Sequence, residues 1–122
     1  MFLSKLFGTK SEREMKKLSP VIEQINQLYE NLSSKSDSEL LNRTKELREF
    51  VIQTRKEKED SLPKNIDKKE RDSLILKAEQ GALGLIMNEA FAMVKETCRR
   101  MCGSSWKASG LEIKWEMIPY DV

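Results

Sequence analysis

The sequence contains no histidine among its 122 residues, and this absence excludes several kinds of site. Without an imidazole, the chain holds no histidine-based metal site, no Ser–His or Cys–His catalytic pair and no histidine proton shuttle. Its two cysteines, Cys98 and Cys102, are too few for the disulfide framework of a small secreted domain. They lie one helical turn apart, and we interpret them as small, half-buried apolar side chains in a reducing compartment.

Glycine, proline and long apolar runs are also scarce. Five glycines and three prolines, together with 34% charged residues, favour long solvated helices over a sheet-rich fold. No apolar run approaches the roughly 20 residues that span a bilayer, and Ser4-Lys5 interrupts the stretch that a signal peptide would need. The net charge of +2 predicts no general binding to nucleic acid. We therefore expect a cytosolic or peripheral protein.

Residues 1–10 form a short amphipathic leader. Its apolar and basic side chains recur at helical spacing and are Phe2, Leu3, Lys5, Leu6, Phe7 and Lys10. Such a segment suits weak, reversible contact with a membrane surface, because lysines near anionic lipid contribute about 1 kcal/mol each. A frayed tail, or a segment that docks on its own protein, explains the pattern equally well.

Two amphipathic helices are predicted next. Ser11 to Glu14 fits a capping box that begins a helix ending near Leu32, with Pro20 expected to kink it or to restart it with Ser19 as cap. Ser36 to Glu39 is a second box and begins a helix through about Lys58. The short connection predicts that the two helices pack as an antiparallel hairpin over residues 11–60. Their apolar stripes also allow a coiled-coil dimer, although two to three heptads favour packing within one chain.

The rest of the chain is predicted to be helical until near its end. A mixed-charge run around Pro63 predicts a solvated loop, and residues 74–101 predict one interrupted helix or two that meet near Asn88. Residues 111–117 alternate apolar and polar, which predicts a strand that has no partner in an otherwise helical chain. We therefore expect a mainly α protein with one C-terminal strand, and an unpartnered strand indicates a piece of something larger.

Several blocks of residues, in order along almost the whole chain, resemble one family. They are Lys5-Leu6-Phe7-Gly8, Ser36-Asp37-x-Glu39-Leu40, Glu89-Ala90-Phe91-Ala92-x-Val94-Lys95-Glu96 with Arg99-Arg100, and Met117-x-Pro119-Tyr120-Asp121-Val122. This succession resembles the amino-terminal end of SecA, the ATP-driven motor of bacterial preprotein translocation. The sequence departs from the family at Asn88, where proline is frequent, and at residues 103–114, which are similar to an insertion of some branches.

The resemblance implies that ATP and magnesium serve the intact family member and that this chain holds no cofactor. In the family, a glutamine that helps hold the adenine directly follows the position of Val122, and the phosphate loop lies a little beyond. No G-x-x-x-x-G-K-[ST] or G-x-G-x-x-G pattern occurs in the sequence. We expect no catalytic, nucleotide-binding or metal-binding residue here, and no ATP binding or hydrolysis by this chain alone.

The resemblance also implies partners and a domain organisation. The partners are an acidic phospholipid surface, a membrane protein-conducting channel, preproteins through the intact motor and a possible second protomer, on the inner face of the cytoplasmic membrane. We expect a leader over 1–10, a helical hairpin over 11–60, a helical segment over 61–103 and the incomplete start of a motor domain over 104–122, whose sheet the strand would join. The alternative is a stand-alone helical interaction protein that associates peripherally with membranes.

Overall fold

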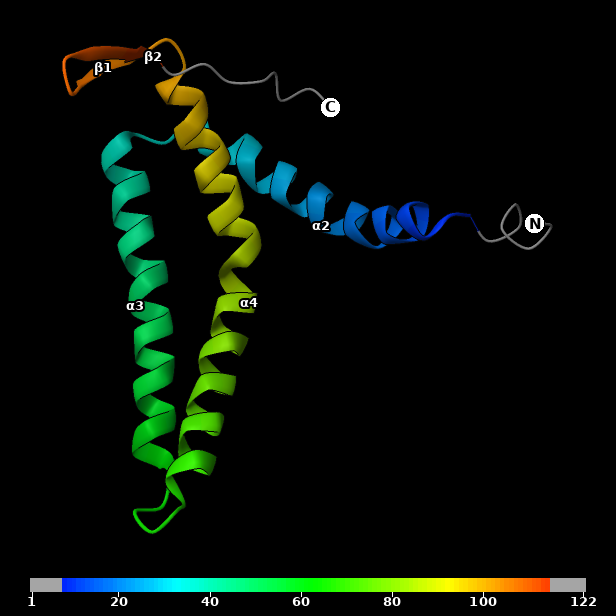
Figure 1. Ribbon diagram of the computed structural model, residues 1–122, viewed down its shortest axis with the longest axis vertical. Helices are drawn as coiled ribbons and strands as arrows, with labels where there is room; N and C mark the ends of the chain where they lie inside the picture. Colours follow the sequence, from blue (N-terminus) through cyan, green and yellow to red (C-terminus); the bar gives the residue numbers. More distant parts are fainter. Residues whose placement is uncertain (1–7, 115–122) are drawn as a thin grey trace.

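The computed structural model describes residues 8–114, which form three helices and a β-hairpin (Figure 1). The elements follow in the order α2 (Lys10–Leu32), α3 (Asp37–Ser61), α4 (Lys68–Met101), β1 (Ser105–Ala108) and β2 (Leu111–Lys114). The mainly α class expected from composition is confirmed. In the described part of the chain, no helix is long and apolar enough to cross a membrane.

Capping side chains determine where the helices begin. At α3, Ser36 Oγ accepts a hydrogen bond from the Glu39 amide at 3.2 Å, and Glu39 Oε2 accepts one from the Ser36 amide at 2.7 Å. The predicted second capping box is thus confirmed. At α4, Asp67 accepts hydrogen bonds from the amides of Lys69 and Glu70. Each box or cap satisfies amides that lack a partner within the helix.

The first helix begins two residues earlier than predicted. Thr9 is its N-cap, and the capping box joins Thr9 to Glu12 instead of Ser11 to Glu14. The two patterns overlap in the sequence, and Gly8, at a φ of 70°, lets the chain turn directly before Thr9. The helix does not restart at Pro20, because Ser19 Oγ donates back to the Met15 carbonyl instead of capping a new turn.

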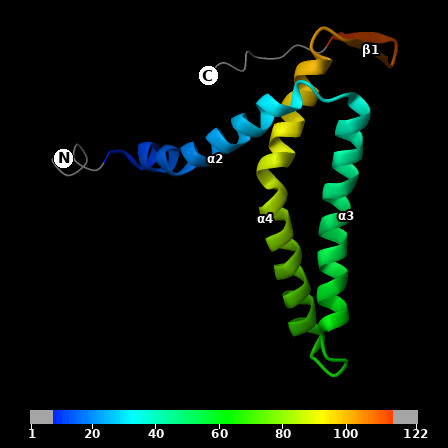
Figure 2. The ribbon, with the colours of Figure 1, turned by 180° about the vertical axis from the view of Figure 1, so that it is seen from behind.

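The antiparallel hairpin of the molecule is formed by α3 and α4, which lie side by side over their lengths (Figures 1 and 2). The prediction that the first two helices form this hairpin over residues 11–60 is wrong. α2 instead packs on α4 and leaves the hairpin at a wide angle. A short connection joins the ends of two helices without determining the angle between them, and α4 offers the longer apolar surface. Both other helices therefore pack on α4.

The core lies between α3 and α4. Its buried apolar side chains are Leu40, Leu47, Ile75, Ala82, Ala92 and Met93. Leu40 and Leu47 of α3 lie in this core, whereas Thr44 between them is exposed. α2 contributes no buried residue, and the amino-terminal part of its apolar stripe, Met15 and Leu18, is at least half exposed. The stripe on α2 was thus predicted correctly as a pattern, but the fold leaves much of it open.

The chain changes from helix to hairpin at Gly103, whose φ is 79°. Strand β2 lies within the predicted strand, whose residues 115–117 are outside the described residues. The expectation that this strand lacks a partner is wrong, because β1 pairs with it in an antiparallel register that joins Trp106 to Ile113. Ser109 and Gly110, both at positive φ, form the two-residue turn between the strands.

Candidate docking surface and arginine cluster

The residues predicted to contact a membrane or channel lie almost entirely outside the described residues. The structure does not describe Phe2, Leu3, Lys5, Leu6 and Phe7. Lys10 is the first residue of α2 and is exposed. The structure therefore does not test the contact assignment, and it places only Lys10, at the end of α2 far from the hairpin (Figure 1).

An apolar stripe runs along α4 on the surface of the molecule. Its members are Leu83, Ile86, Met87, Ala90, Phe91 and Val94, which together line a shallow depression. Phe91 is 56% exposed and Val94 is 60% exposed, so neither is covered by another described element. Their spacing of three and four residues places them on one side of the helix. A helix with such a stripe ordinarily packs it against a partner.

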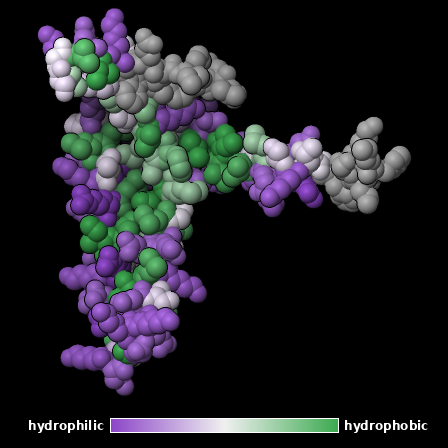
Figure 3. Space-filling view, viewed as in Figure 1, coloured by the Kyte–Doolittle hydropathy of each residue, from purple (hydrophilic) through white to green (hydrophobic). Residues whose placement is uncertain are grey.

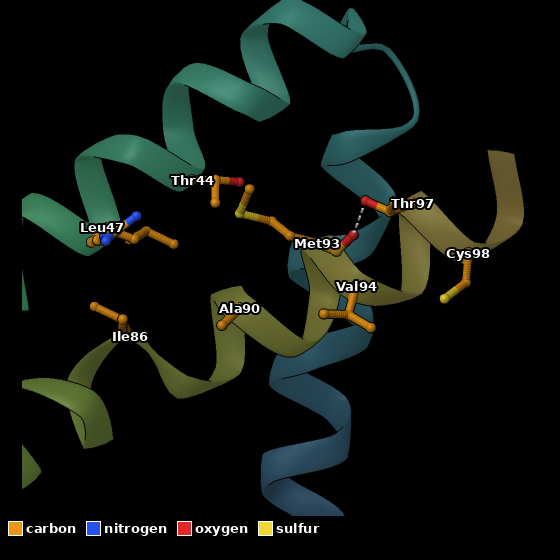
Figure 4. Close-up of a pocket in the computed structure, with 9 residues that line it drawn as sticks. Thr44, Leu47, Ile86, Ala90, Met93, Val94, Thr97 and Cys98 are labelled. Atoms are coloured by element: carbon orange, nitrogen blue, oxygen red, sulfur yellow. Dashed lines mark hydrogen bonds between the residues drawn. The ribbon is translucent and has the colours of Figure 1, made fainter. Parts of the chain in front are cut away.

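A groove between α3 and α4 borders this stripe. The residues that line it are Thr44, Leu47, Arg48, Ile86, Ala90, Met93, Val94, Thr97 and Cys98, and its volume is about 380 Å³. Figure 4 shows Thr44 and Leu47 of α3 facing side chains of α4 across the groove. The Thr97 hydroxyl donates to the Met93 carbonyl at 2.8 Å (Figure 4), so its hydrogen is bonded within α4. The groove is consequently apolar in character.

Apolar surface is concentrated near the meeting point of the three helices. In the space-filling view, hydrophobic side chains gather over the upper parts of α3 and α4 and the adjacent part of α2, whereas the far end of the hairpin is hydrophilic (Figure 3). Contiguous exposed apolar surface of this kind marks interaction sites in soluble proteins. The stripe and the groove together form the candidate docking surface.

Polar side chains gather beneath this region around Glu96, which is completely buried. Its Oε1 accepts hydrogen bonds from Arg99 and Arg100 at 2.7 Å each, and its Oε2 accepts one from Arg99 at 2.9 Å. Three charge-assisted hydrogen bonds from two arginines compensate the cost of removing one carboxylate from water. We call Glu96, Arg99, Arg100 and Asp37 the arginine cluster.

Arg100 connects three segments of the chain. Its Nη1 donates to Asp37 Oδ1 at 2.6 Å, at the beginning of α3. Its Nη2 donates to the carbonyls of Leu32 at 3.1 Å and Lys35 at 2.5 Å, at the end of α2 and in the turn that follows. Together with Glu96 of α4, this single guanidinium therefore holds all three helices near one point.

The arginine cluster shifts the titration of its buried carboxyl. Hydrogen bonds from Arg99 lower the pKa of Glu96 to about 2, with a further contribution from Arg100, while burial acts in the opposite direction. Since the ionised form is the one that the arginines stabilise, Glu96 remains charged at neutral pH. Its role is electrostatic and structural, because a carboxylate with so low a pKa is a poor proton acceptor near neutral pH.

A second ion pair joins α3 to α4 further along the hairpin. Arg43 Nε and Nη2 donate to the two carboxylate oxygens of Glu89 at 2.6 and 2.9 Å, and Nη1 donates to Glu46 at 2.7 Å. The bidentate geometry is the favourable arrangement for a guanidinium and a carboxylate. It lowers the pKa of Glu89 chiefly through the hydrogen bonds from Arg43. The sequence analysis singled out neither ion-pair group for a role, although Glu89, Glu96, Arg99 and Arg100 all lie in the family-like block.

The three described helices do not offer a phosphate-binding end. A nucleotide phosphate is usually held by free amides at a helix N-terminus. Here the side chains of Thr9 and Ser36 each accept from one amide of the first turn and Asp67 accepts from two, and each first turn carries an acidic residue that disfavours a bound anion. These three helix ends therefore do not fit the phosphates of ATP.

Comparison with known proteins assigns the chain to a family. The family described as SecA DEAD-like domain matches residues 3–122. The chain belongs to the SecA family. It is 34% identical to the Protein translocase subunit SecA of Prosthecochloris aestuarii over 137 aligned residues, covering 98% of this chain and 13% of that relative. It is 37% identical to that of Salinibacter ruber over 158 aligned residues, covering 99% of this chain and 14% of that relative.

The match to SecA relatives is confined to a small part of their length. The chain spans about 13–14% of the length of these curated proteins. No solved structure matches the chain. The resemblance to SecA that the sequence blocks indicated is thus confirmed.

Proposed function

We propose that this chain forms the amino-terminal part of an ATP-driven motor for preprotein export across the cytoplasmic membrane, and that it contributes packing and contact instead of catalysis. The family assignment, combined with the small fraction of the relatives that the chain spans, carries the proposal. ATP and magnesium would be bound by the remainder of such a motor. The helices of this chain would provide a rigid support beside it.

The candidate docking surface supports the packing role. The stripe on α4 presents Phe91 and Val94 to solvent, next to an apolar groove. Burial of apolar area contributes about 25 cal/mol per Å², so covering this surface favours association with the rest of the motor. In this proposal the rest of a SecA-type motor covers the stripe, whereas the polar far end of the hairpin remains in water.

The packing role is tested by complementation in two pieces. A SecA relative that lacks the segment matching this chain is mixed with the chain, and complex formation is measured by size-exclusion chromatography with light scattering. We expect a one-to-one complex that Phe91→Glu weakens, because a charge is placed in the apolar contact. Leu85→Glu is the matched control: Leu85 is 79% exposed, and it lies about 200° around the helix from Leu83. The absence of any complex, or equal loss in both variants, contradicts the packing role.

The contact role rests on the leader. Phe2, Leu3, Lys5, Leu6, Phe7 and Lys10 would bring apolar and basic side chains to an acidic phospholipid surface or to the membrane channel, on the inner face of the cytoplasmic membrane. We expect the chain to bind vesicles that contain anionic lipid weakly and to be released by salt. Deletion of residues 1–8 should abolish this binding, as measured by vesicle sedimentation. Unchanged binding after the deletion excludes the leader as the contact.

The chain alone should not respond to nucleotide. Because the helix N-termini are capped and no phosphate loop occurs in the sequence, titration with ATP and magnesium should give no saturable heat in calorimetry. A micromolar affinity would contradict the assignment of nucleotide binding to the remainder of the motor.

A further inference from the structure

We propose that Arg100 is a releasable lock that determines the direction in which α2 leaves the α3–α4 hairpin. When its contacts to the connection over residues 32–37 are broken, α2 swings about that connection while the hairpin remains folded. This inference goes beyond the packing and contact roles and does not depend on them. It rests on the unequal way in which α2 and α3 are attached to α4.

α2 is attached to the hairpin near its carboxyl-terminal end, where Val21, Ile25, Tyr29 and Leu32 are half-buried and polar side chains reach α4. Asn88 donates to Gln24 at 2.6 Å, and Lys95 donates to Asn26 at 2.9 Å and lies 4.4 Å from the centre of the Tyr29 ring. No residue of α2 is buried, and its amino-terminal part projects away from the other helices (Figures 1 and 2). Solvated contacts of this kind exchange readily for contacts with water, so they hold a direction only weakly.

The hairpin has its own means of staying folded. Leu40, Leu47 and Ile75 are buried between α3 and α4. The bidentate pair of Arg43 with Glu89 joins the same two helices without any part of α2. Removal of a contact to α2 therefore leaves the interior of the hairpin unchanged.

Arg100 contacts the connection between α2 and α3 directly. Its Nη2 donates to carbonyls on both sides of Ser33 and Ser34, and its Nη1 holds Asp37 at the start of α3. The connection is thus fixed at both of its ends by one side chain. Hydrogen bonds to two backbone carbonyls and one carboxylate are directional. The position of the guanidinium therefore determines the angle between α2 and α3.

The two sides of the lock differ in strength. Glu96 is completely buried, and its bond to Arg100 is shielded from solvent, whereas the Asp37 side chain is 91% exposed. Salt and competing anions weaken an exposed pair more than a buried one. Arg100 therefore keeps its hydrogen bond to Glu96 when its bonds to Leu32, Lys35 and Asp37 break, and it can form those bonds again.

A consequence for the leader follows from chain order. Residues 1–7 directly precede the turn at Gly8 and the start of α2. The direction of α2 therefore determines on which side of the hairpin Gly8 and Thr9 lie. Release of Arg100 would change the position from which the leader reaches a surface.

Distance measurements between spin labels test the lock. In a background with Cys98→Ala and Cys102→Ala, one label pair at Lys16→Cys and Lys56→Cys reports the α2–α3 direction. A second pair at Lys56→Cys and Lys77→Cys reports the hairpin. With Arg100 present, we expect a single narrow distance distribution for both pairs by double electron–electron resonance.

Arg100→Gln should shift and broaden the first distribution and leave the second unchanged. Arg99→Gln is the matched control, because it removes the same charge and one cation from Glu96 while the four acceptors of Arg100 stay in place. It should leave both distributions narrow. The proposal is overturned if Arg100→Gln leaves the first pair narrow, if it also broadens the second pair, or if Arg99→Gln broadens the first pair equally.

Discussion

The α3–α4 hairpin and helix α2 are both amphipathic, yet they are stabilised in different ways. The hairpin buries Leu40, Leu47 and Ile75 between two long helices, whereas α2 buries no residue completely and is held near its carboxyl-terminal end by half-buried apolar side chains and polar contacts. The comparison shows that an apolar stripe predicts that a helix forms but does not predict how much of the stripe the fold covers. On α2 the amino-terminal part of the stripe, Met15 and Leu18, stays at least half exposed.

The largest difference between the two regions should appear when a core leucine is shortened. Leu47 is 7% exposed, so Leu47→Ala leaves a cavity between α3 and α4 and should lower the free energy of unfolding by about 2–5 kcal/mol. Urea denaturation followed by circular dichroism measures this change. A loss below about 1 kcal/mol would mean that the hairpin interior is not the main source of stability.

The second largest change in stability is expected when the pH is lowered, and it arises where α2 meets the hairpin. The pKa of Glu96 is lowered to about 2 in the folded chain, against an ordinary value of 4.5, so the unfolded state binds the proton more readily. The stability that Glu96 contributes is therefore complete above about pH 4.5 and is lost as pH falls from there to about 2, by up to about 3 kcal/mol.

Urea denaturation at several pH values checks this acid dependence. Glu96→Gln removes the titrating group, so its stability should fall less steeply between pH 4.5 and 2 than that of the parent chain. Some slope should remain, because the pKa values of Glu39 and Glu89 are also lowered. Identical slopes for the variant and the parent would show that Glu96 does not titrate in the way its contacts imply.

A smaller effect is expected for the ion pair that belongs to the hairpin alone. Arg43 is 46% exposed and Glu89 is 27% exposed, so their coupling is screened by solvent despite its bidentate geometry. A double-mutant cycle of Arg43→Ala and Glu89→Ala should give a coupling free energy of about 1 kcal/mol. The coupling should decrease in high salt, and a value that does not change with salt would contradict a solvent-screened pair.

The smallest effect is expected for the open stripe of α2. Ile22 is 45% exposed, and Ile22→Ala should change the free energy of unfolding by about 0.5 kcal/mol or less, although the same residue type in the hairpin core costs far more. Ile75→Ala is the matched comparison, because Ile75 is 8% exposed. Equal destabilisation by the two variants would remove the distinction between the regions.

The predictions from local pattern succeeded where the interaction is local. Ser36 and Glu39 lie three residues apart and satisfy one another, so the start of α3 follows from the sequence alone. The same logic placed the first box at Ser11 to Glu14, whereas the structure has it at Thr9 to Glu12, directly after the turn at Gly8. At Asn88, two alternatives were left open; α4 runs through it without interruption because asparagine, unlike the proline frequent in the family, keeps its amide hydrogen.

The site features that escaped the sequence analysis depend on contacts between distant residues. Arg100 meets Leu32, Lys35 and Asp37 across more than sixty positions of chain. No spacing rule relates these residues, so an arginine in a charged helix gave no signal of its own. The only available indication was the position of Glu96, Arg99 and Arg100 in the block that resembles SecA. The membrane-contact prediction for Phe2 to Lys10 remains a prediction.

The sequence by itself determined the helical class, the capped start of α3, the relation to SecA and the lack of a phosphate loop, because each depends on residue type and short spacing. Only the tertiary structure decided that α4 is the common partner of α2 and α3, that β1 pairs with β2, and that Glu96 is buried between arginines. Those outcomes depend on which surfaces compete for the same apolar face. That competition is settled by the packing of the whole chain and not by any segment of it.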